Sequence, residues 1–369
     1  MNVVFIIPTG IGASIGGHAG DATPVAKLIA ACCDNLILHP NVVNASAINE
    51  MSDNALYVEG SMLDSFLAGH IGLNRSRGNR VLVAVNYPLT IDTINAVNAA
   101  RATIGMDAEI MCLDTPLEME GIIENDGTAG GKMSGHQELC KQVKNYYHSD
   151  NFGALAIVTK IKVSMEDGKR YFMHGGVNPW GGIEAMLSKF IATTFDSEYQ
   201  SPLPVAHAPE DDGLFDALRG IVRPAMAAEW SSMCYLHCVL KGLYRAPRLM
   251  RLDNTNEHLA DLTNRDIDFL VSPDCWGPPH QYATVYDIKQ IVVTDNRTML
   301  PDEKNRIQTP SQIIVDNYLE AAGVIMAARA GVSLDSVMGK LVPAKINGKH
   351  MNYEEMNEFT SLTGKELKQ

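Results

Sequence analysis

The sequence lacks a hydrophobic run long enough to span a bilayer, since no apolar stretch approaches the roughly 20 residues that a membrane helix needs. Residues 1–8 contain neither a basic segment nor a small-residue cleavage site, which predicts a chain without a signal peptide. Basic residues are the minority, with 30 lysines and arginines against 43 acidic residues and a formal net charge of −13. This charge opposes phosphate backbones and anionic membranes, so we expect neither nucleic acid nor a membrane as a partner.

Cysteine occurs seven times, an odd number without the spacing of a disulfide framework, which predicts a reducing compartment and a cytoplasmic location. The sequence has no H-E-x-x-H motif and no paired C-x-x-C. Cys234, His237 and Cys238 would share one helix face, but three ligands from one helical turn rarely close a tetrahedral zinc site. We therefore expect no metal and no cofactor, although His39 and His207 together with carboxylates leave a metal site open as an alternative.

The order of the segments predicts the fold class. Short β-branched runs alternate with longer apolar-periodic runs, which is typical of βαβ units and a parallel sheet. We expect an α/β fold of mostly parallel sheets flanked by helices, in two Rossmann-like halves with a cleft between them. Pro202 and Pro204 lie in the most linker-like stretch, so we predict an N-terminal domain at residues 1–199 with a glycine-rich loop and a C-terminal domain at residues 200–369 with long helices.

The expected elements follow from apolar periodicity and from turn and cap residues. Strands are expected at residues 3–7, 36–38, 55–58, 80–85, 108–113, 154–159, 267–271 and 291–294. Helices are expected at residues 23–33, 61–67, 90–105, 137–147, 183–195, 214–222, 225–241 and 312–330. Asp167-Gly168 predicts the turn of a hairpin at residues 163–173. Residues 115–135 have few signals and several glycines, so we expect a long loop there.

In open parallel sheets, ligands bind outside the carboxyl ends of the strands, so the residues that follow each strand are candidates for a site. Here they include Thr9, Gly10, His39, Asn41, Glu59, Lys160, His207, Asp274, Cys275 and Asn296. Turns and helix caps also need polar residues at strand ends, which is the plainer explanation for any one of them. Histidine, glutamate and lysine are not favoured turn residues, however, so the set as a whole favours a site.

Residues 8–21 form the most unusual stretch. Its glycines allow backbone amides to approach an anion, and the helix that follows adds positive potential. The stretch is not a dinucleotide fingerprint, because the glycine spacing is one residue too long and the second strand ends in His39 instead of an acidic residue. We predict a mobile loop that closes over a small ligand, with a flexible surface loop as the alternative.

Residues 272–280 contain the best candidate for a nucleophile. Cys275 follows a strand and lies near His280 in the sequence, so it could be an activated thiolate, with Asp274 orienting the histidine or acting as a base. The alternative is a buried cysteine in a rigid proline turn. Cys112 ends a strand in the first half, and a cysteine from each half would suit a two-base racemase.

Several segments also carry a family resemblance. Residues 4–44, with their glycine-rich stretch and the run from His39 to Ala45, together with Glu59, Asp64 and residues 272–299, resemble the uncharacterised domain of unknown function 3326 family of cyanobacteria and plant plastids. The resemblance covers roughly residues 3–340 and is specific at the two ends. It supports the fold and implies no established activity.

These observations predict an enzyme acting on a small metabolite that bears a carboxylate or phosphate, by acid–base chemistry of the isomerase, lyase or hydrolase type. The predicted catalytic residues are His39, Glu59, Asp274, Cys275 and His280. The predicted ligand-binding residues are Thr9, Gly10, Gly12, Gly16, Gly17, His18, Asp21, Asn41, Lys160 and Asn296. The alternatives are a non-catalytic small-anion sensor and an acyl or phosphoryl transferase with Lys160 or Lys132 in the cleft. A homodimer is the base-rate expectation.

Overall fold

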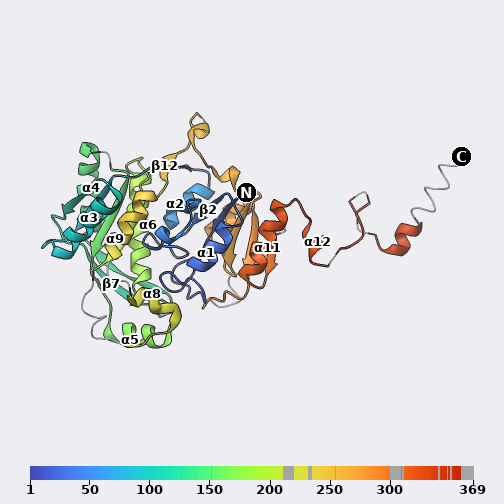
Figure 1. Cartoon of the computed structure of the whole chain (residues 1–369), viewed down its shortest axis with the longest axis horizontal. Coiled ribbons are helices and arrows are strands. Elements are labelled where there is room, and N and C mark those ends of the chain that lie inside the picture. Colours follow the sequence, from blue (N-terminus) through green and yellow to red (C-terminus); the bar gives the residue numbers. More distant parts are fainter. Residues whose placement is uncertain are drawn as a thin grey trace. The chain divides into compact units, whose positions relative to one another are not determined.

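The computed structural model (Figure 1) describes residues 1–125, 127–150, 152–210, 220–231, 235–253, 255–299, 309, 311–339, 341–346, 348–349 and 351–358, and only the backbone of residues 147–150, 230 and 231. The chain divides into two compact units, Met1–Ala322 and Gly323–Gln369. Helix α11 (Tyr318–Arg329) begins in the first unit and ends in the second, which also contains α12 (Leu334–Val337). Position 200, where the sequence predicts a boundary, lies inside the first unit.

A six-stranded parallel sheet contains both the first and the last strands of the first unit. Its order is β15-β14-β13-β1-β2-β3. The strands are β1 (Asn2–Phe5), β2 (Asn35–Leu38), β3 (Ala55–Tyr57), β13 (Phe269–Pro273), β14 (Lys289–Val293) and β15 (Gln312–Val315). Leu36, Ile37 and Leu38 are all fully buried, because helices cover parallel strands on both faces and such strands are continuous apolar runs.

A second parallel sheet has the order β11-β9-β5-β6. Its strands are β5 (Val81–Val85), β6 (Ala108–Cys112), β9 (Ala154–Thr159) and β11 (Val205–Pro209). Two helices link the sheets: α6 (Gly181–Ser197) contacts β11 and helix α2 (Gly60–Leu67), and α9 (Tyr235–Arg245) contacts both β3 and β9. One buried core therefore runs through both sheets, from Val4 and Ile37 to Leu82 and Leu155.

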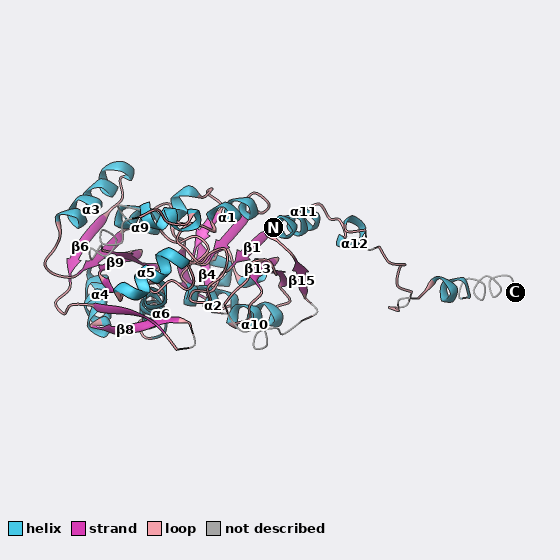
Figure 2. Ribbon diagram, turned by 90° about the horizontal axis from the view of Figure 1, so that it is seen from below, coloured by secondary structure: helices cyan, strands magenta, loops and turns pink. Residues whose placement is uncertain are grey.

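The first unit contains further helices, drawn in cyan in Figure 2, some of which contact strands of the two parallel sheets. They are α1 (Thr23–Ala30), α3 (Ile91–Ile104), α4 (His136–Asp150), α5 (Met165–His174), α8 (Ala227–Ser231) and α10 (Pro278–Val285). The antiparallel pair β4 (Ile71–Asn74) and β12 (Arg248–Arg251) lies beside them. The predicted α/β fold with mostly parallel sheets flanked by helices is confirmed. Among the described residues, no helix is both long enough and apolar enough to cross a bilayer.

Three local predictions are wrong. The expected loop at residues 115–135 contains an antiparallel hairpin of β7 (Glu118–Ile123) and β8 (Ala129–Ser134), to which β10 (Ile161–Lys162) adds a parallel strand. The expected hairpin at residues 163–173 is helix α5, because the Ser164 hydroxyl caps the Asp167 N–H over 3.0 Å and tertiary packing overrides the turn signal. Residues 312–315 are strand β15 instead of the start of a long helix.

Two expected helices fall wholly or partly outside the description. The helix predicted at residues 214–222 falls mainly on residues 211–219, which lie outside the described residues. The helix predicted at residues 225–241 corresponds to a turn of 3-10 helix (Pro224–Met226), α8 and α9, and residues 232–234 also lie outside the description.

Candidate functional site

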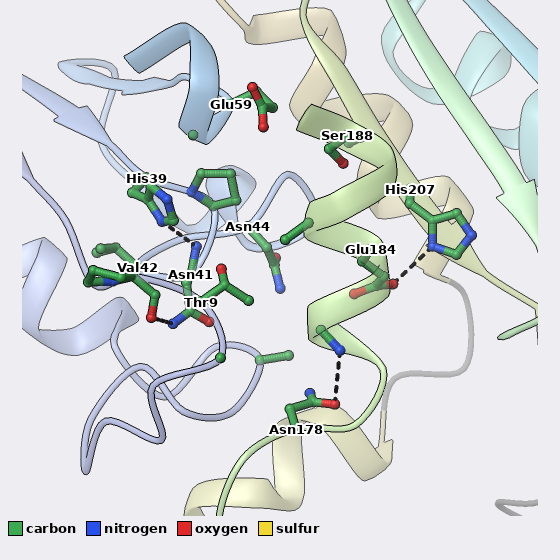
Figure 3. A pocket seen from close by; sticks show the side chains of 18 of the residues that line it. Thr9, His39, Asn41, Val42, Asn44, Glu59, Asn178, Glu184, Ser188 and His207 are labelled. Atoms are coloured by element: carbon green, nitrogen blue, oxygen red, sulfur yellow. Dashed lines mark hydrogen bonds and ion pairs between the residues drawn. The ribbon is translucent and has the colours of Figure 1, made fainter. Parts of the chain in front are cut away.

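A cavity of about 540 Å³ lies at the carboxyl ends of β1, β2, β3 and β11, against one face of helix α6. Figure 3 shows Thr9, His39, Asn41 and Glu59 on one side of this cavity and α6 on the other. Its volume is within the range of pockets that hold small metabolites. The strand ends therefore border a cavity, and a helix supplies its second wall.

The α6 wall presents Glu184 and Ser188, four residues apart and therefore on the same helix face. Glu184 Oε1 lies 2.9 Å from His207 Nδ1, and the Glu184 side chain is 31% exposed while that of His207 is 2% exposed. His207 is on β11, and its other ring nitrogen, Nε2, lies 2.9 Å from the Thr159 hydroxyl. The carboxylate thus faces the cavity with a buried histidine held behind it.

The Thr159 hydroxyl can serve both protonation states of His207. It lies within hydrogen-bond reach of His207 Nε2 and 3.3 Å from Met119 Sδ. When the ring is neutral and Nδ1–H donates to Glu184, the hydroxyl donates to Nε2. When the ring is charged, Nε2–H donates to the hydroxyl, which donates to the thioether. The buried His207 Nε2 therefore has a hydrogen-bond partner in either case.

His39 and Glu59 occupy the opposite wall (Figure 3). His39 Nδ1 accepts the Asn41 N–H over 3.3 Å, which leaves the ring proton on Nε2, and burial lowers the pKa of His39 to about 4. Glu59 caps helix α2, where its Oε2 accepts the N–H groups of Ser61 and Met62 at 2.8 and 3.2 Å. Burial raises the pKa of Glu59, and these hydrogen bonds oppose that rise. His39 is therefore a neutral donor, and Glu59 is first of all a helix cap.

The glycine-rich segment of residues 8–21 lines the cavity and is held by hydrogen bonds to Asp21 and Asn296. Gly10, Gly12 and Gly16 have φ of +79°, +60° and +89°, a backbone conformation that strongly favours glycine. The Gly16 N–H donates to Asp21 Oδ1 over 3.0 Å, and burial raises the pKa of Asp21 to about 6. Asn296, which follows β14, holds the loop: its side-chain oxygen accepts the Ile15 N–H at 2.8 Å, and its amide nitrogen donates to the Ile15 carbonyl at 3.0 Å.

A second buried polar group lies under this loop. The Tyr171 hydroxyl donates to Glu229 Oε2 over 2.8 Å and accepts from His18 Nδ1 at 2.7 Å. Glu229 Oε1 accepts a hydrogen bond from Asn178 Nδ2 at 2.9 Å. Asn178 Oδ1 in turn accepts hydrogen bonds from the N–H groups of Trp180 and Gly181 at the start of α6. Burial raises the pKa of Glu229 to about 7. This group joins the loop to helices α5, α8 and α6.

The segment of residues 272–280 is built as a rigid turn. Cys275 is 5% exposed, and burial raises the pKa of its thiol to about 12. His280 is fully buried: its Nδ1 accepts the Gly277 N–H at 3.1 Å, and its Nε2–H donates to the Ser272 hydroxyl at 2.9 Å. Burial lowers the pKa of His280 to about 4, and its ring stacks on Trp276 at 5.4 Å. The thiol is therefore protonated at neutral pH, and both nitrogens of His280 serve the turn.

The cavity brings together some of the predicted site residues and leaves others outside. Those that line it are Thr9, Gly10, Gly12, Gly17, His18, His39, Asn41, Glu59 and His280. Those that do not line it are Gly16, Asp21, Lys160, Asp274, Cys275 and Asn296. Gly16, Asp21 and Asn296 shape the loop, while Lys160 is exposed at the end of β9.

Sequence reasoning missed the residues that helices contribute. Glu184, Ser188 and Asn178 come from α6 and its cap, and Glu229 from α8. A stripe of small and polar residues at spacings of three and four, from Gly181 through Glu184 and Ala185 to Ser188, is the sequence signal that could have pointed to the α6 wall. Among the described residues, no group of three or more histidine, cysteine, aspartate or glutamate side chains is placed to hold a metal ion.

Fold and cavity together define an α/β protein with a metabolite-sized cavity at its strand ends. The chain belongs to the DUF3326 family of proteins of unknown function, whose model matches residues 2–338, so the resemblance seen in the sequence is confirmed. A relative from Synechococcus, the uncharacterized lipoprotein syc1174_c, is 31% identical over 342 residues, which cover 89% of this chain and 91% of the relative. No solved structure matches the chain.

The relative corrects one expectation. The cytoplasmic location predicted from the cysteine pattern and the amino-terminal residues is contradicted, because this relative is named as a lipoprotein. Buried, scattered cysteines such as Cys32, Cys33 and Cys140 explain why the pattern misled: cysteines that serve packing carry no information about the compartment.

Proposed function

We propose that this protein is an enzyme that binds a small polar metabolite in the cavity and moves protons on it, with Glu184 as the general acid–base. The observation that carries the proposal is the 2.9 Å contact between Glu184 Oε1 and the buried ring of His207. A carboxylate that faces a cavity and is oriented from behind by a second titratable group is the arrangement that acid–base catalysis needs.

Each partner has a separate task in this proposal. Glu184 takes a proton from the substrate or returns one, and His207 holds the carboxylate in one orientation and stabilises its charge. His207 is a positioning residue, since its ring is buried and both nitrogens are engaged. On the opposite wall, the His39 Nε2–H supplies a neutral donor for an oxygen on which charge develops.

An isomerase, lyase or hydrolase reaction fits this set of groups. The transferase alternative predicts Lys160 or Lys132 in the cavity, and neither lines it, although Lys189 does. The alternative of a non-catalytic binding protein uses the same cavity and differs only in turnover, so the experiment must detect turnover without knowledge of the substrate.

The experiment incubates the purified protein with a bacterial metabolite extract in D₂O and follows all species by mass spectrometry. We expect at least one species to be consumed or to gain deuterium, because proton transfer exchanges substrate hydrogen with solvent. Glu184→Gln should lower this rate by about 10²-fold or more, the usual contribution of a general acid–base. Glu138→Gln, at an exposed position of α4 outside the cavity, is the matched control and should leave it unchanged.

The variant His207→Gln distinguishes a role of His207 in positioning Glu184 from a merely structural role. It should lower the rate and move the pH at which the rate is half-maximal, whereas a merely structural histidine would leave the pH profile in place. If no species changes with the wild-type protein while a metabolite is retained in native mass spectra, the protein is a binding protein and the enzymatic proposal is refuted.

The lipoprotein name of the Synechococcus relative also supports a membrane-anchored location for this protein. Fractionation of cells that express the natural gene tests this, with recovery in the membrane fraction as the expected result. Recovery of all the protein in the soluble fraction would refute it.

A further inference from the structure

We infer that the natural ligand carries a protonated amine and is held through it by carboxyl groups of the cavity, instead of through a phosphate or carboxylate of its own. This inference rests on the proposed function, because it names the substrate class of the same cavity. Three features of the cavity support it: the use of its backbone donors, the charge of its lining and its aromatic rings.

The backbone donors at the helix starts beside the cavity, where an anion could be held, are already used. At the start of α2, the N–H groups of Ser61 and Met62 donate to Glu59. At the start of α6, the first N–H groups donate to Asn178 Oδ1 at 2.9 and 3.2 Å. In each case a side chain of the protein occupies the position that an anion would take at a helix N-terminus.

The third helix that begins at the cavity is closed to anions for a different reason. Helix α10 opens with Pro278 and Pro279, which have no N–H, and the N–H of Gly277 donates to His280. In the glycine-rich loop, the Gly16 N–H likewise donates to Asp21. The N–H groups at the starts of these helices and that of Gly16 in the loop are therefore engaged within the protein.

Acidic side chains dominate the lining. Among the described residues that line the cavity, the carboxyl groups are those of Glu59, Asp64, Glu184, Glu210 and Glu229, whereas Lys189 is the one lysine and no arginine is present. The charge of Lys189 acts on Glu59 and Asp64, where it lowers both pKa values against the larger effect of burial. Among the other carboxyl groups, Glu184 contacts His207, while Glu210 and Glu229 have no lysine or arginine partner within the described lining.

The cavity stabilises positive charge more than negative charge. Burial raises the pKa of Asp64 to about 6 and that of Glu229 to about 7, so ionisation of these groups is costly in the empty cavity. An incoming ammonium group lowers that cost, whereas an incoming phosphate increases it. Trp180 and Trp276 also line the cavity, and indole faces attract cations.

The two tryptophans make the test specific to the cavity. The probes are ethanolammonium chloride as the cation, and sodium acetate and inorganic phosphate as the anions, at constant ionic strength and pH 7.5. The readout is the indole ¹H–¹⁵N signals of Trp180 and Trp276 in NMR spectra of the full chain. We expect ethanolammonium to shift both signals with a Kd at least tenfold lower than that of either anion.

Variants connect the binding to the carboxyl groups. Glu184→Gln and Glu229→Gln should each raise the Kd of ethanolammonium by about tenfold, the effect of one lost charge pair in a partly buried site. Glu138→Gln should leave the Kd unchanged. Tighter binding of acetate or phosphate, or the absence of any cation-induced shift of the indole signals, would overturn the inference.

The two proposals can fail separately. Turnover that depends on Glu184 without ethanolammonium binding would refute the ligand class and leave the acid–base function standing. Ethanolammonium binding without any turnover in the extract would refute the enzymatic function and leave the ligand class standing.

Discussion

The buried carboxyl of Glu229 should make the stability of this protein depend on pH in a direction opposite to that of most carboxylates. Burial raises its pKa from the ordinary value of 4.5 to about 7 in the folded protein. The folded state therefore binds more protons than the unfolded state between these two values. The stabilising contribution is complete below pH 4.5 and is lost as the pH rises through 7.

The magnitude follows from the two pKa values. At 1.36 kcal/mol for each pKa unit, ionised Glu229 lowers the free energy of unfolding by about 3 kcal/mol at pH 8 relative to pH 4.5. Glu229→Gln removes this titration. The substitution also lowers the free energy of unfolding by about 1–3 kcal/mol at every pH. The reason is that glutamine has one acceptor oxygen, so it can accept the hydrogen bond of Tyr171 or that of Asn178 but not both.

Urea unfolding at several pH values between 4.5 and 8 measures this effect. The wild-type protein should lose stability relative to Glu229→Gln as the pH rises. The free energy of unfolding of the wild type minus that of the variant should fall by about 3 kcal/mol, from positive values at pH 4.5 to zero or below at pH 8. Only the difference between wild type and variant isolates Glu229, because the neighbouring His18 also titrates. Burial lowers the pKa of His18, so its contribution to the stability of the protein increases as the pH rises. Parallel curves for wild type and variant would refute the reasoning, and Glu138→Gln should follow the wild type throughout.

Two further predictions concern residues outside the cavity. Burial raises the pKa of Cys275 to about 12, so roughly one Cys275 thiol in 10⁴ is ionised at pH 8. Iodoacetamide should therefore label the exposed Cys112 long before Cys275. Equal labelling of the two cysteines in peptide maps would show that the 272–280 turn is open. Asn296→Ala removes the two hydrogen bonds to the backbone of Ile15. The substitution should lower the free energy of unfolding by about 2 kcal/mol and speed hydrogen exchange of the Ile15 amide. Unchanged exchange of this amide would mean that other contacts hold the loop.

The sequence allowed the parallel strands and the edge of the site to be predicted. The continuous apolar run of Leu36, Ile37 and Leu38 indicates a strand buried on both faces, and such a strand must end at a polar turn. Because parallel strands end at the same edge, His39 and Glu59 could be expected together, and both line the cavity.

What the sequence could not supply depends on contacts between distant segments. Glu184 lies inside a helix, so nothing at a strand end points to it, and its role depends on His207 from the neighbouring strand. Glu229 contacts Tyr171 and Asn178, which come from separate elements. The hairpin of β7 and β8 is glycine-rich because the backbone approaches closely there: a Cβ on Gly131 would lie 2.2 Å from the Glu120 carbonyl. Such close approach suppresses the β-branched residues by which strands are recognised.

In the 272–280 turn, the structure favours the alternative of a buried cysteine over that of a reactive thiolate. A cysteine and a histidine five residues apart suggest a reactive pair, but reactivity depends on exposure, and both side chains are buried. The same histidine at the surface would be free to act as a base, whereas here its two nitrogens fix the backbone of Gly277 and the hydroxyl of Ser272.

The position of β1 has a consequence for biosynthesis. Val3 pairs with Leu36 on one side and with Phe269 on the other, so the first strand leaves the ribosome long before its second neighbour is made. Until then one edge of β1 has open N–H and C=O groups, which invite pairing with other chains. The glycine-rich loop is completed even later, because its Ile15 is held by Asn296, which is synthesised after Phe269. A nascent or truncated chain that ends before this point has no finished cavity, so ligand binding can report only on chains that have been synthesised past Asn296.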